Sequence, residues 1–410
     1  MSALMRGFGL IDQLADVEDP QDVYAQMTRN DYDQYLRDFR PFEEALLQAR
    51  NDTSLIDQAR EDVQTQRRIA GEVQTRNLER YGGAGLSNAQ RQQQQRSLQR
   101  GGQLGMVNTV NNARIQQRQI NNALLNELID SIKRFKESTD VAICILDAGL
   151  SEDQKTELSS KVDEIKSAEW DIKVPDSKIK GREWLKSQVS RAFLPKYFPS
   201  YEKYLWIDCD AWVNDWQSVE LYFKACENGK LGITQTIGPG YKITSRVNWV
   251  FGKLAIIKSQ NFKHAIKSNI SLEKARKLAF APHINIGVFS LEKNSTCWNS
   301  WQENLKQTLK GGEIFGSEQL AMNMSVYVDN VETEFLPLNC NWITSNLLPK
   351  FDEDKDTWVE PYLPNYKIGI MHLAAGIWKD NEDMRLNKNI KIDIQTLTGK
   401  ILNKSLRFNN

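Results

Sequence analysis

The stretch YLWIDCD, residues 204–210, decides how this 410-residue chain is interpreted. Its first four residues form a short apolar run, which predicts a buried β-strand. Asp208 and Asp210 follow directly, so both carboxylates are expected just past the end of that strand, while Cys209 is expected to point into the core. Ligands of open α/β sheets bind beyond the carboxyl ends of the strands, and carboxylate oxygens suit Mg²⁺ or Mn²⁺. The stretch therefore predicts a divalent-cation site at a sheet edge.

Further apolar runs alternate with helical patterns on both sides of this stretch. Ser151 precedes a helical pattern with acids in its first turn, as a helix N-cap does. The alternation favours an α/β sheet of mixed strand order. We expect helices at 150–165 and 182–198, and strands at 141–146, 231–235, 250–257, 284–290, 326–328 and 368–373.

The composition changes abruptly near residue 130. Residues 1–130 contain 15 Arg, 19 Gln and no Lys, whereas residues 131–410 contain 31 Lys and 7 Arg. All 11 Trp, all five Cys and all three His lie in the later part. Neither folding nor solubility requires such a switch between the two cations, so we interpret the chain as two segments of different ancestry.

Residues 1–130 have the composition of helices but few residues that could form a core. Such a helical segment needs a partner to be stable, which favours a homo-oligomer or a larger multiprotein assembly. A partly disordered tail and a glutamine-rich linker are the alternatives.

The charge and the cysteine pattern exclude several classes of protein. The 53 basic and 53 acidic residues balance, which argues against a sequence-specific or general nucleic-acid binder. No apolar run is long enough to span a membrane, and the start of the chain has no apolar stretch of signal-peptide length before its first acid, so we expect no secretion. The five scattered cysteines imply no disulfide framework, and a reducing compartment is the simpler expectation.

The first segment resembles the helical internal-virion or ejection-type proteins of short-tailed bacteriophages. The likeness lies in an Arg-, Gln- and Asn-rich helical pattern that is broken by YGGAGLS at 81–87. The resemblance implies a phage-particle component that is assembled in the bacterial cytoplasm and contacts copies of itself or other virion proteins. It identifies no catalytic residue.

The later segment resembles glycosyltransferase family 8, the retaining sugar transferases with a GT-A fold that include glycogenin and bacterial galactosyltransferases. The resemblance covers about residues 120–380 and rests on several motifs in the family's order. They are ILDAGLS (145–151), YLWIDCDAWV (204–213), INIGV (284–288), SEQLAMN (317–323), LPLNCNW (336–342) and MHLAAGIWK (371–379). The resemblance implies a GT-A-like α/β fold that follows the all-α module.

The resemblance also implies a role for individual residues. Asp208, Asp210 and His372 would bind Mn²⁺ or Mg²⁺, and Glu318 and Gln319 would lie under the anomeric carbon as the catalytic pair. The residues that would bind the nucleotide-sugar donor are Arg191, Asn285, Gly287, Gly376 and Lys379. Attack by the acceptor hydroxyl on the donor's front face is the preferred path, and a double displacement through Glu318 is the rival.

Several of these residues also have ordinary structural interpretations. His372 follows an apolar run and suits a buried core histidine, Lys379 suits a solvated charge, and Glu318 suits a surface helix position. We interpret His264 and His283 as structural. The many tryptophans serve either the core or a sugar-stacking surface, and the sequence leaves both open.

Two departures from the family pattern stand out. The sequence before residue 131 lacks the apolar first strand that carries the family's nucleotide-base pocket. The spacing in HLAAG is one residue longer than in the family, and Trp378 precedes Lys379 instead of following it. The base pocket and the phosphate loop are therefore expected to differ from those of the family.

These observations predict a helical assembly module (1–130), a GT-A-like domain (131–380) and a C-terminal tail (381–410). One hypothesis is an active, metal-dependent retaining hexosyltransferase on a phage particle, with a nucleotide-sugar donor, UDP-linked in the family's manner, and a glycan acceptor. The alternative is a non-catalytic virion component whose transferase-like domain only packs or contacts glycans.

Overall fold

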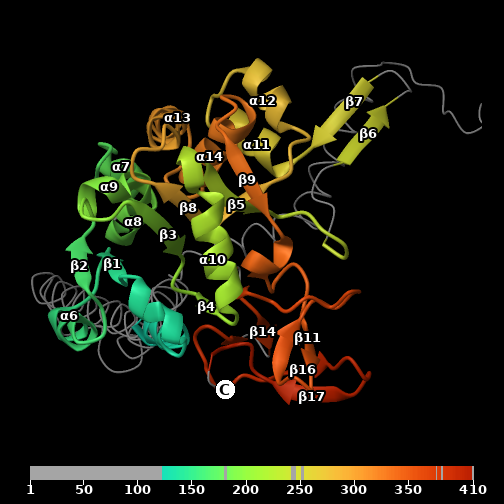
Figure 1. The fold of residues 1–410 in the computed structure, drawn as a ribbon. Coiled ribbons are helices and arrows are strands. Elements are labelled where there is room, and N and C mark those ends of the chain that lie inside the picture. The colour runs from blue at the N-terminus through green and yellow to red at the C-terminus, as the bar shows by residue number, and fades with distance from the viewer. Residues whose placement is uncertain are drawn as a thin grey trace, which may run out of the picture. The chain divides into compact units, whose positions relative to one another are not determined.

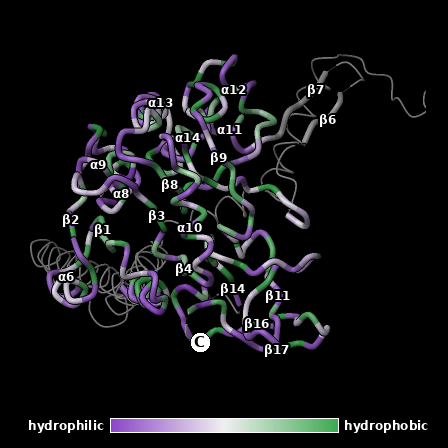
Figure 2. Tube along the Cα trace, in the orientation of Figure 1, coloured by the Kyte–Doolittle hydropathy of each residue, from purple (hydrophilic) through white to green (hydrophobic). Residues whose placement is uncertain are grey.

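The computed structural model describes residues 122–408, apart from 180–181, 242–245, 251–253, 375 and 380–381 (Figure 1). The predicted all-α module at 1–130 lies outside the described residues, except for its last nine. Those nine belong to a helix that is described from 122 to 133. Among the described residues, no helix is both long and apolar enough to cross a bilayer. Figure 2 shows hydrophilic residues interleaved with apolar ones along α12 and α13.

A four-stranded mixed sheet forms the centre of the fold, in the order β3-β8-β5-β9. The long strand β8 runs antiparallel to both of its neighbours, whereas β5 and β9 are parallel. This mixed arrangement agrees with the expected α/β class. The strands are β3 (Lys203–Ile207), β8 (Ile284–Glu292), β5 (Leu231–Gln235) and β9 (Thr333–Leu336).

Smaller sheets surround the central one. A three-stranded sheet has the order β10-β13-β4, formed by Trp342–Ile343, Ile370–His372 and Ala211–Val213. The parallel pair is β1 (Cys144–Asp147) and β2 (Glu164–Ser167). The antiparallel pairs are β6 (Arg246–Val250) with β7 (Leu254–Lys258), β11 (Lys350–Asp352) with β12 (Thr357–Val359), β14 (Trp378–Lys379) with β15 (Glu382–Asp383), and β16 (Ile392–Gln395) with β17 (Ile401–Lys404).

Helices cover both faces of the central sheet. Neighbouring residues of β8 point to opposite faces, and Val288 packs with α10 while Phe289 packs with α13. After the helix at 122–133, the α-helices of the described residues are α6 (Glu152–Ser159), α7 (Asp176–Ile179), α8 (Lys186–Ser190), α9 (Leu194–Tyr197), α10 (Trp216–Ala225), α11 (Gln260–Lys267), α12 (Leu272–Leu278), α13 (Cys297–Gly311) and α14 (Ser317–Tyr327). Short 3₁₀ turns lie at Lys136–Asp140, Glu183–Leu185, Arg191–Phe193, Glu227–Gly229 and Leu338–Asn341.

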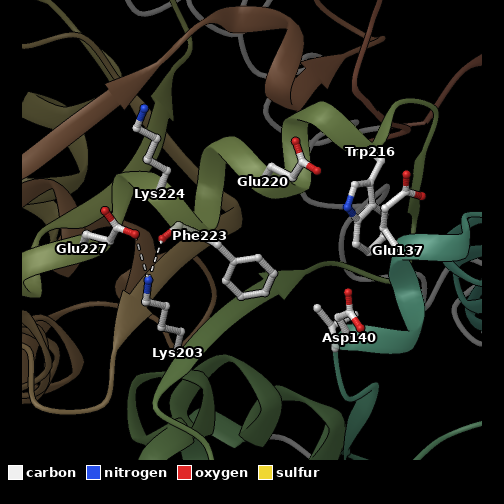
Figure 3. A pocket seen from close by; sticks show the side chains of 9 residues that line it. Glu137, Asp140, Lys203, Trp216, Glu220, Phe223, Lys224 and Glu227 are labelled. Carbon is white, nitrogen blue, oxygen red and sulfur yellow. Dashed lines mark hydrogen bonds and ion pairs between the residues drawn. The ribbon is translucent and has the colours of Figure 1, made fainter.

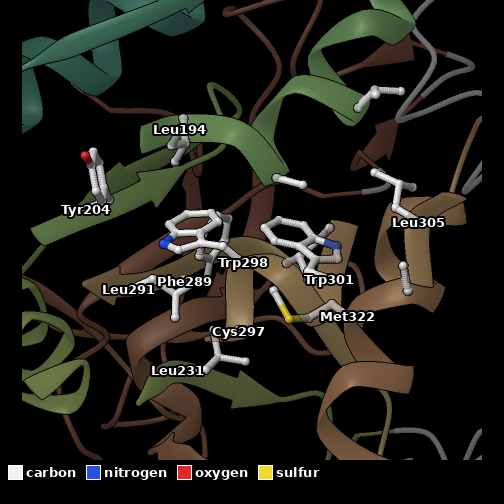
Figure 4. Packing of buried hydrophobic residues seen from close by; sticks show 14 of the residues in the cluster. Leu194, Tyr204, Leu231, Phe289, Leu291, Cys297, Trp298, Trp301, Leu305 and Met322 are labelled. Carbon is white, nitrogen blue, oxygen red and sulfur yellow. The ribbon is translucent and has the colours of Figure 1, made fainter. Parts of the chain in front are cut away.

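Tryptophans fill the largest hydrophobic cluster. Trp298 and Trp301 of α13 stack at 6.1 Å between ring centroids, and Phe289 meets Trp301 edge-on at 5.2 Å (Figure 4). Both tryptophans are buried, as is Trp212 in a second cluster. These three rings therefore belong to the hydrophobic core and not to a sugar-stacking surface.

Four expected elements differ in the structure. The strand expected at 326–328 is wrong, because α14 continues through Val326 to Tyr327 and the next strand is β9. The strand expected at 250–257 is instead a hairpin of β6 and β7. Helix α6 ends at Ser159, and the last two residues of the expected 150–165 helix belong to β2, which begins at Glu164. The expected 182–198 helix is divided into short α and 3₁₀ turns.

No strand precedes Cys144 in the described part of the chain, from 122 onward. Most of the sequence in which the first family strand is expected to be missing precedes residue 122 and lies outside the described residues, so that expectation stays a prediction. β1 pairs only with β2 among the described strands, and β3 pairs only with β8. The sheet is thus divided between the β1–β2 pair and the central four strands.

The segment expected as a tail at 381–410 contributes strands and core residues. Met384 and Leu406 are fully buried, and Phe408 packs against Trp212. Trp212 also donates its Nε1–H to the carbonyl of Leu406 at 2.8 Å. The last described residues therefore form part of the same folded body as the central strands.

Candidate metal centre

Two carboxylates lie in the short turn between β3 and β4. The backbone N–H of Asp208 donates to the carbonyl of Gly287 on β8 at 2.7 Å, and the backbone N–H of Ala211 closes the turn onto the Asp208 carbonyl at 3.0 Å. The carbonyl of Asp210 accepts from the N–H of Leu373 at 2.9 Å. Backbone hydrogen bonds thus fix this turn between β8 and the chain that follows β13. Cys209, expected to point into the core, is exposed, so that expectation is wrong.

His372 joins the two aspartates from a distant part of the chain. It ends β13, where the antiparallel register places it opposite Ala211, next to Asp210. Its Nε2 lies 3.3 Å from Oδ1 of Asp210, and its side chain is 2% exposed. One ligand atom from each of Asp208, Asp210 and His372 lies within 4.8 Å of the others. The convergence of these residues is the geometry that the sequence interpretation required.

The hydrogen bond of the second ring nitrogen orients His372. Its Nδ1 lies 2.9 Å from Oδ1 of Asn341, a carbonyl oxygen that can only accept. Nδ1 therefore carries the proton, and in the neutral ring the lone pair is on Nε2, which faces Asp210. Metal-binding histidines are typically held in this way by an outer hydrogen bond.

Gly287 lies where this imidazole approaches the sheet. A Cβ atom at that position would be 2.2 Å from Cε1 of His372 and 3.0 Å from Oδ2 of Asp208. Only a residue without a side chain leaves room for the ring. Because that Cβ position is close to both His372 and Oδ2 of Asp208, this oxygen lies on the side of the turn that faces His372.

Arg191 and Trp206 hold the other oxygen of Asp208. Trp206 donates its Nε1–H to Oδ1 at 2.7 Å, and the buried Arg191 guanidinium is 3.2 Å from the same oxygen. Arg191 also stacks on the Trp206 ring, 4.9 Å from its centroid. Both contacts leave Oδ2 as the oxygen that faces the centre of the cluster.

A second buried arginine pairs with Asp210. Arg385 lies 3.4 Å from Oδ2 of Asp210, and two of its nitrogens donate to Asp383 at 2.6 and 2.9 Å. Burial favours protonation of Asp210, but its interactions with His372 and with the Arg385 guanidinium outweigh burial and lower the pKa of the carboxyl below its usual range. Asp210 is therefore ionised over the whole neutral range.

The donor set fits a hard divalent cation. Asp208, Asp210 and Asp383 carry three negative charges against the two of Arg191 and Arg385, so the cluster has one negative charge in excess when His372 is neutral. The 3.3 Å between the ligand atoms of Asp210 and His372 is close to the spacing of about 3 Å between adjacent ligands of an octahedral ion with bonds of 2.0–2.1 Å. Carboxylate oxygen with one imidazole suits Mn²⁺ or Mg²⁺.

The expected donor-binding residues lie at different distances from this cluster. Oδ1 of Asn285 accepts from the N–H of Gly287 at 2.9 Å and from Nδ2 of Asn341 at 3.3 Å, which links Asn285 to the residue that holds His372. Gly376 has φ +70°, and a Cβ there would be 2.5 Å from Asp383. Lys379 is exposed and donates to the carbonyl of Lys391 at 2.7 Å, and no described contact joins it to the cluster.

The expected catalytic pair begins helix α14. Glu318 is buried, and its carbonyl accepts from Nε1 of Trp301 at 2.9 Å. Nε2 of Gln319 lies 2.7 Å from Nε2 of His283, the residue before β8. Glu318 is therefore not the surface residue of the alternative interpretation.

Sequence reasoning missed Arg385, Asp383 and Asn341 as parts of this cluster. Asn341 lies inside the LPLNCNW motif that supported the family resemblance, so the motif contained a signal for it. Arg385 and Asp383 lie in the segment taken as a tail, and no local pattern in the sequence marks them.

A separate hollow lies along α10, away from the cluster (Figure 3). Its lining includes Glu137, Asp140, Glu220 and Glu227, with Lys203 and Lys224, and aromatic walls from Trp216 and Phe223. Lys203 is paired with Glu227 at 3.2 Å. None of these residues belongs to the metal cluster, so the hollow adds nothing to its chemistry.

No protein-family model matches the sequence, and no curated protein matches it. Among solved structures the chain is similar to the galactosyltransferase LgtC in complex with donor and acceptor sugar analogues, at 14% identity and a TM-score of 0.37, over 61% of this chain and 82% of that one. It is similar to the bifunctional glycosyltransferase WbbM at 16% identity and a TM-score of 0.39, over 65% of this chain and 46% of that one. An active-site mutant of LgtC gives 14% identity and a TM-score of 0.36, over 61% of this chain and 82% of that one.

We expect Asn341→Ala to weaken Mn²⁺ binding by about 10–100-fold, the usual effect of removing the outer partner of a histidine ligand. The variant removes the acceptor that keeps the proton on Nδ1 of His372. A calorimetric titration with Mn²⁺ measures the change. Asn339→Ala is the matched control, because the Asn339 side chain donates to the Lys367 carbonyl outside the cluster. Equal affinities of the two variants would contradict the role of Asn341.

Proposed function

We propose that the described domain is a metal-dependent retaining glycosyltransferase, which moves a hexosyl group from a UDP-linked sugar to a hydroxyl acceptor. The observation that carries the proposal is the convergence of Asp208, Asp210 and His372, with His372 held in the tautomer that presents Nε2. Two carboxylates and one imidazole, drawn from distant parts of the chain, form one cradle for a cation.

In this proposal Asp208, Asp210 and His372 would hold Mn²⁺ or Mg²⁺, which would supply the positive charge that a diphosphate leaving group needs. Arg191 fixes Asp208. Its Nε is buried and has no hydrogen-bond acceptor among the described residues, so it suits a phosphate oxygen of the donor. Asn285 and Gly287 line the same strand face.

The transfer itself is proposed to follow the front-face path. The acceptor oxygen bonds to the anomeric carbon as the bond from that carbon to the diphosphate oxygen breaks. The hydroxyl proton passes to the departing phosphate oxygen, and the anomeric configuration is kept. Gln319 and Glu318, at the start of α14, are proposed to face the sugar. A double displacement through Glu318 stays the rival path.

A non-catalytic packing or glycan-contact role is the second candidate. Two observations favour it: no strand precedes Cys144 among residues 122–143, and Arg385 already contacts the Oδ2 atom of Asp210. A domain of this kind would keep the fold of the cluster without binding a nucleotide.

We also propose, from the sequence alone, that residues 1–130 attach the domain to a phage particle as a homo-oligomer or beside other virion proteins. Most of that segment lies outside the described residues. Analytical ultracentrifugation of the full chain tests it, because a strict monomer would contradict the assembly role.

Calorimetric titration of the full chain with UDP, with and without Mn²⁺, tests the enzymatic proposal. We expect micromolar UDP binding that requires the ion, and its loss in Asp208→Asn. Asp393→Asn is the matched control, because Asp393 pairs with Asn403 on the β16–β17 hairpin. If the unmodified chain fails to bind UDP in the presence of Mn²⁺, the enzymatic proposal is wrong and the packing role is favoured.

A further inference from the structure

Three alternate residues at the start of β8, beginning with the residue that precedes the strand, each contact a different segment of the chain. His283, Asn285 and Gly287 alternate with Ile284, Ile286 and Val288, which are fully buried. The carbonyl of His283 accepts from Thr236 at 2.7 Å, so the extended pairing begins one residue before Ile284. Each of the three meets a different segment: Gln319, Asn341 and His372, respectively.

This row of three residues connects the position of Gln319, at His283, with the metal cluster, at Gly287. The pairing of β8 with β5 shifts register opposite residues 284–289, so His283 and Gly287 lie closer together than the ~13 Å of four fully extended residues. A pyrophosphate with its attached hexose covers a comparable length. A donor whose phosphates lie at the cluster therefore reaches the His283 end of the row with its sugar.

Backbone groups fix the direction of the hydrogen bonds at that end. The N–H of Ile284 donates to Oδ1 of Asn323 at 3.1 Å, so this oxygen must be the acceptor. Nδ2 of Asn323 then donates to the carbonyls of Gln319 and Ile284, at 2.8 and 3.3 Å. Nδ2 of Asn261 donates to the same Oδ1 at 3.1 Å.

The donor and acceptor roles of the His283 hydrogen bonds, including the one to Gln319, follow from these contacts. Because Nδ2 of Asn261 faces Asn323, its Oδ1 faces Nδ1 of His283 at 2.7 Å and can only accept. Nδ1 of His283 must therefore donate. In the neutral ring Nε2 is then the acceptor, and it receives the amide N–H of Gln319 at 2.7 Å. The carbonyl Oε1 of Gln319 is turned away from His283.

We propose that His283 is a positioning residue: through the relay from Ile284, Asn323 and Asn261, it fixes which polar atom of Gln319 the hexosyl group of the donor meets. This inference rests on the proposed function and adds a residue that the family resemblance does not assign. Loss of the hydrogen bond to His283 weakens the bias between the oxygen and the NH₂ group of the Gln319 amide, so selectivity for the sugar-bearing nucleotide would fall.

Two substitutions at His283 distinguish its hydrogen bond to Gln319 from its contribution to packing. An asparagine places its amide near the position of Nδ1, so His283→Asn keeps a partner for Asn261 and removes the hydrogen bond to Gln319. A glutamine reaches the position of Nε2, so His283→Gln keeps an acceptor for Gln319. Tyr327→Phe is the control on the same helix, because it removes only the hydrogen bond from Gln235 to the Tyr327 hydroxyl.

The experiment titrates UDP, UDP-glucose and UDP-galactose into the full chain with Mn²⁺. We expect the unmodified protein to bind one UDP-hexose more tightly than UDP. His283→Asn should lower that affinity by about 3–10-fold, the value of one oriented hydrogen bond, and leave UDP affinity unchanged. His283→Gln and Tyr327→Phe should keep most of the preference.

Failure of this inference is distinguishable from failure of the proposed function. If the unmodified chain binds no UDP, both are overturned. If it binds UDP but prefers no UDP-hexose, or if both His283 variants change the preference equally, only the positioning role is overturned. Selective ¹⁵N-histidine NMR of the unmodified chain gives a test independent of variant folding, since finding the proton on Nε2 instead of Nδ1 of His283 overturns the relay.

Discussion

Gly287→Ala is expected to abolish Mn²⁺ binding while most of the domain stays folded. The new methyl group would lie 2.2 Å from Cε1 of His372 and 3.0 Å from Oδ2 of Asp208. The imidazole must then move away from the aspartates, and the donor atoms no longer share one position. Overpacking of this kind costs about 1–3 kcal/mol in unfolding free energy, which a domain of this size tolerates. Calorimetric titration with Mn²⁺ and thermal unfolding measure the two effects separately.

Gly232→Ala is the matched control for this substitution. Gly232 lies on β5 of the same sheet, and a Cβ there would be 2.3 Å from the Ser290 hydroxyl and 2.8 Å from the Ala225 methyl group. It therefore crowds the core without contacting a metal ligand. We expect similar destabilisation in both variants, with Mn²⁺ binding lost only at Gly287. Retained Mn²⁺ affinity in Gly287→Ala would show that the cluster is not the metal site.

Deletion of residues 405–410 is expected to lower the free energy of unfolding by roughly 5 kcal/mol or more. Leu406 and Phe408 are buried apolar side chains, each worth about 1.5–3 kcal/mol when fully buried. The deletion also removes the acceptor of the Trp212 indole N–H and the Arg407 partner of Glu127. Urea unfolding followed by tryptophan fluorescence measures the change.

Ile401→Ala provides the control in the same segment, because Ile401 is 57% exposed on β17. It should change the unfolding free energy by about 0.5 kcal/mol or less, as expected for an exposed side chain. If the deletion is as mild as this control, the last residues contribute little to the core, and the packing described here would be wrong.

The elements that the sequence predicted well are those with a local physical cause. The apolar run before Asp208 forms β3, and Ser151 caps α6 through the reciprocal hydrogen bonds of a capping box with Gln154. The convergence of Asp208, Asp210 and His372 was predicted through the motif order of a family, not from spacing. It is now found in the geometry of the described residues.

The elements that the sequence missed depend on distant contacts. Val326–Val328 has β-branched residues, yet the packing of α14 against α13 and β8 extends the helix through Val326. The arginine on Asp210 comes from residue 385, and only the folded chain shows that this position is 4% exposed and paired with Asp383. A polar, lysine-rich composition hid the few apolar residues that dock the last segment.

The ion pair between Glu127 and Arg407 joins residues 280 positions apart. Arg134 and Ser131 in turn hold the backbone of β4 and the residue after it, so the first described helix is bound to the middle and to the last part of the chain. During synthesis, that helix leaves the ribosome long before its partner at 407 exists. The domain therefore cannot close until residue 407 has been synthesised, and until then the apolar surface that Leu406 and Phe408 cover stays exposed.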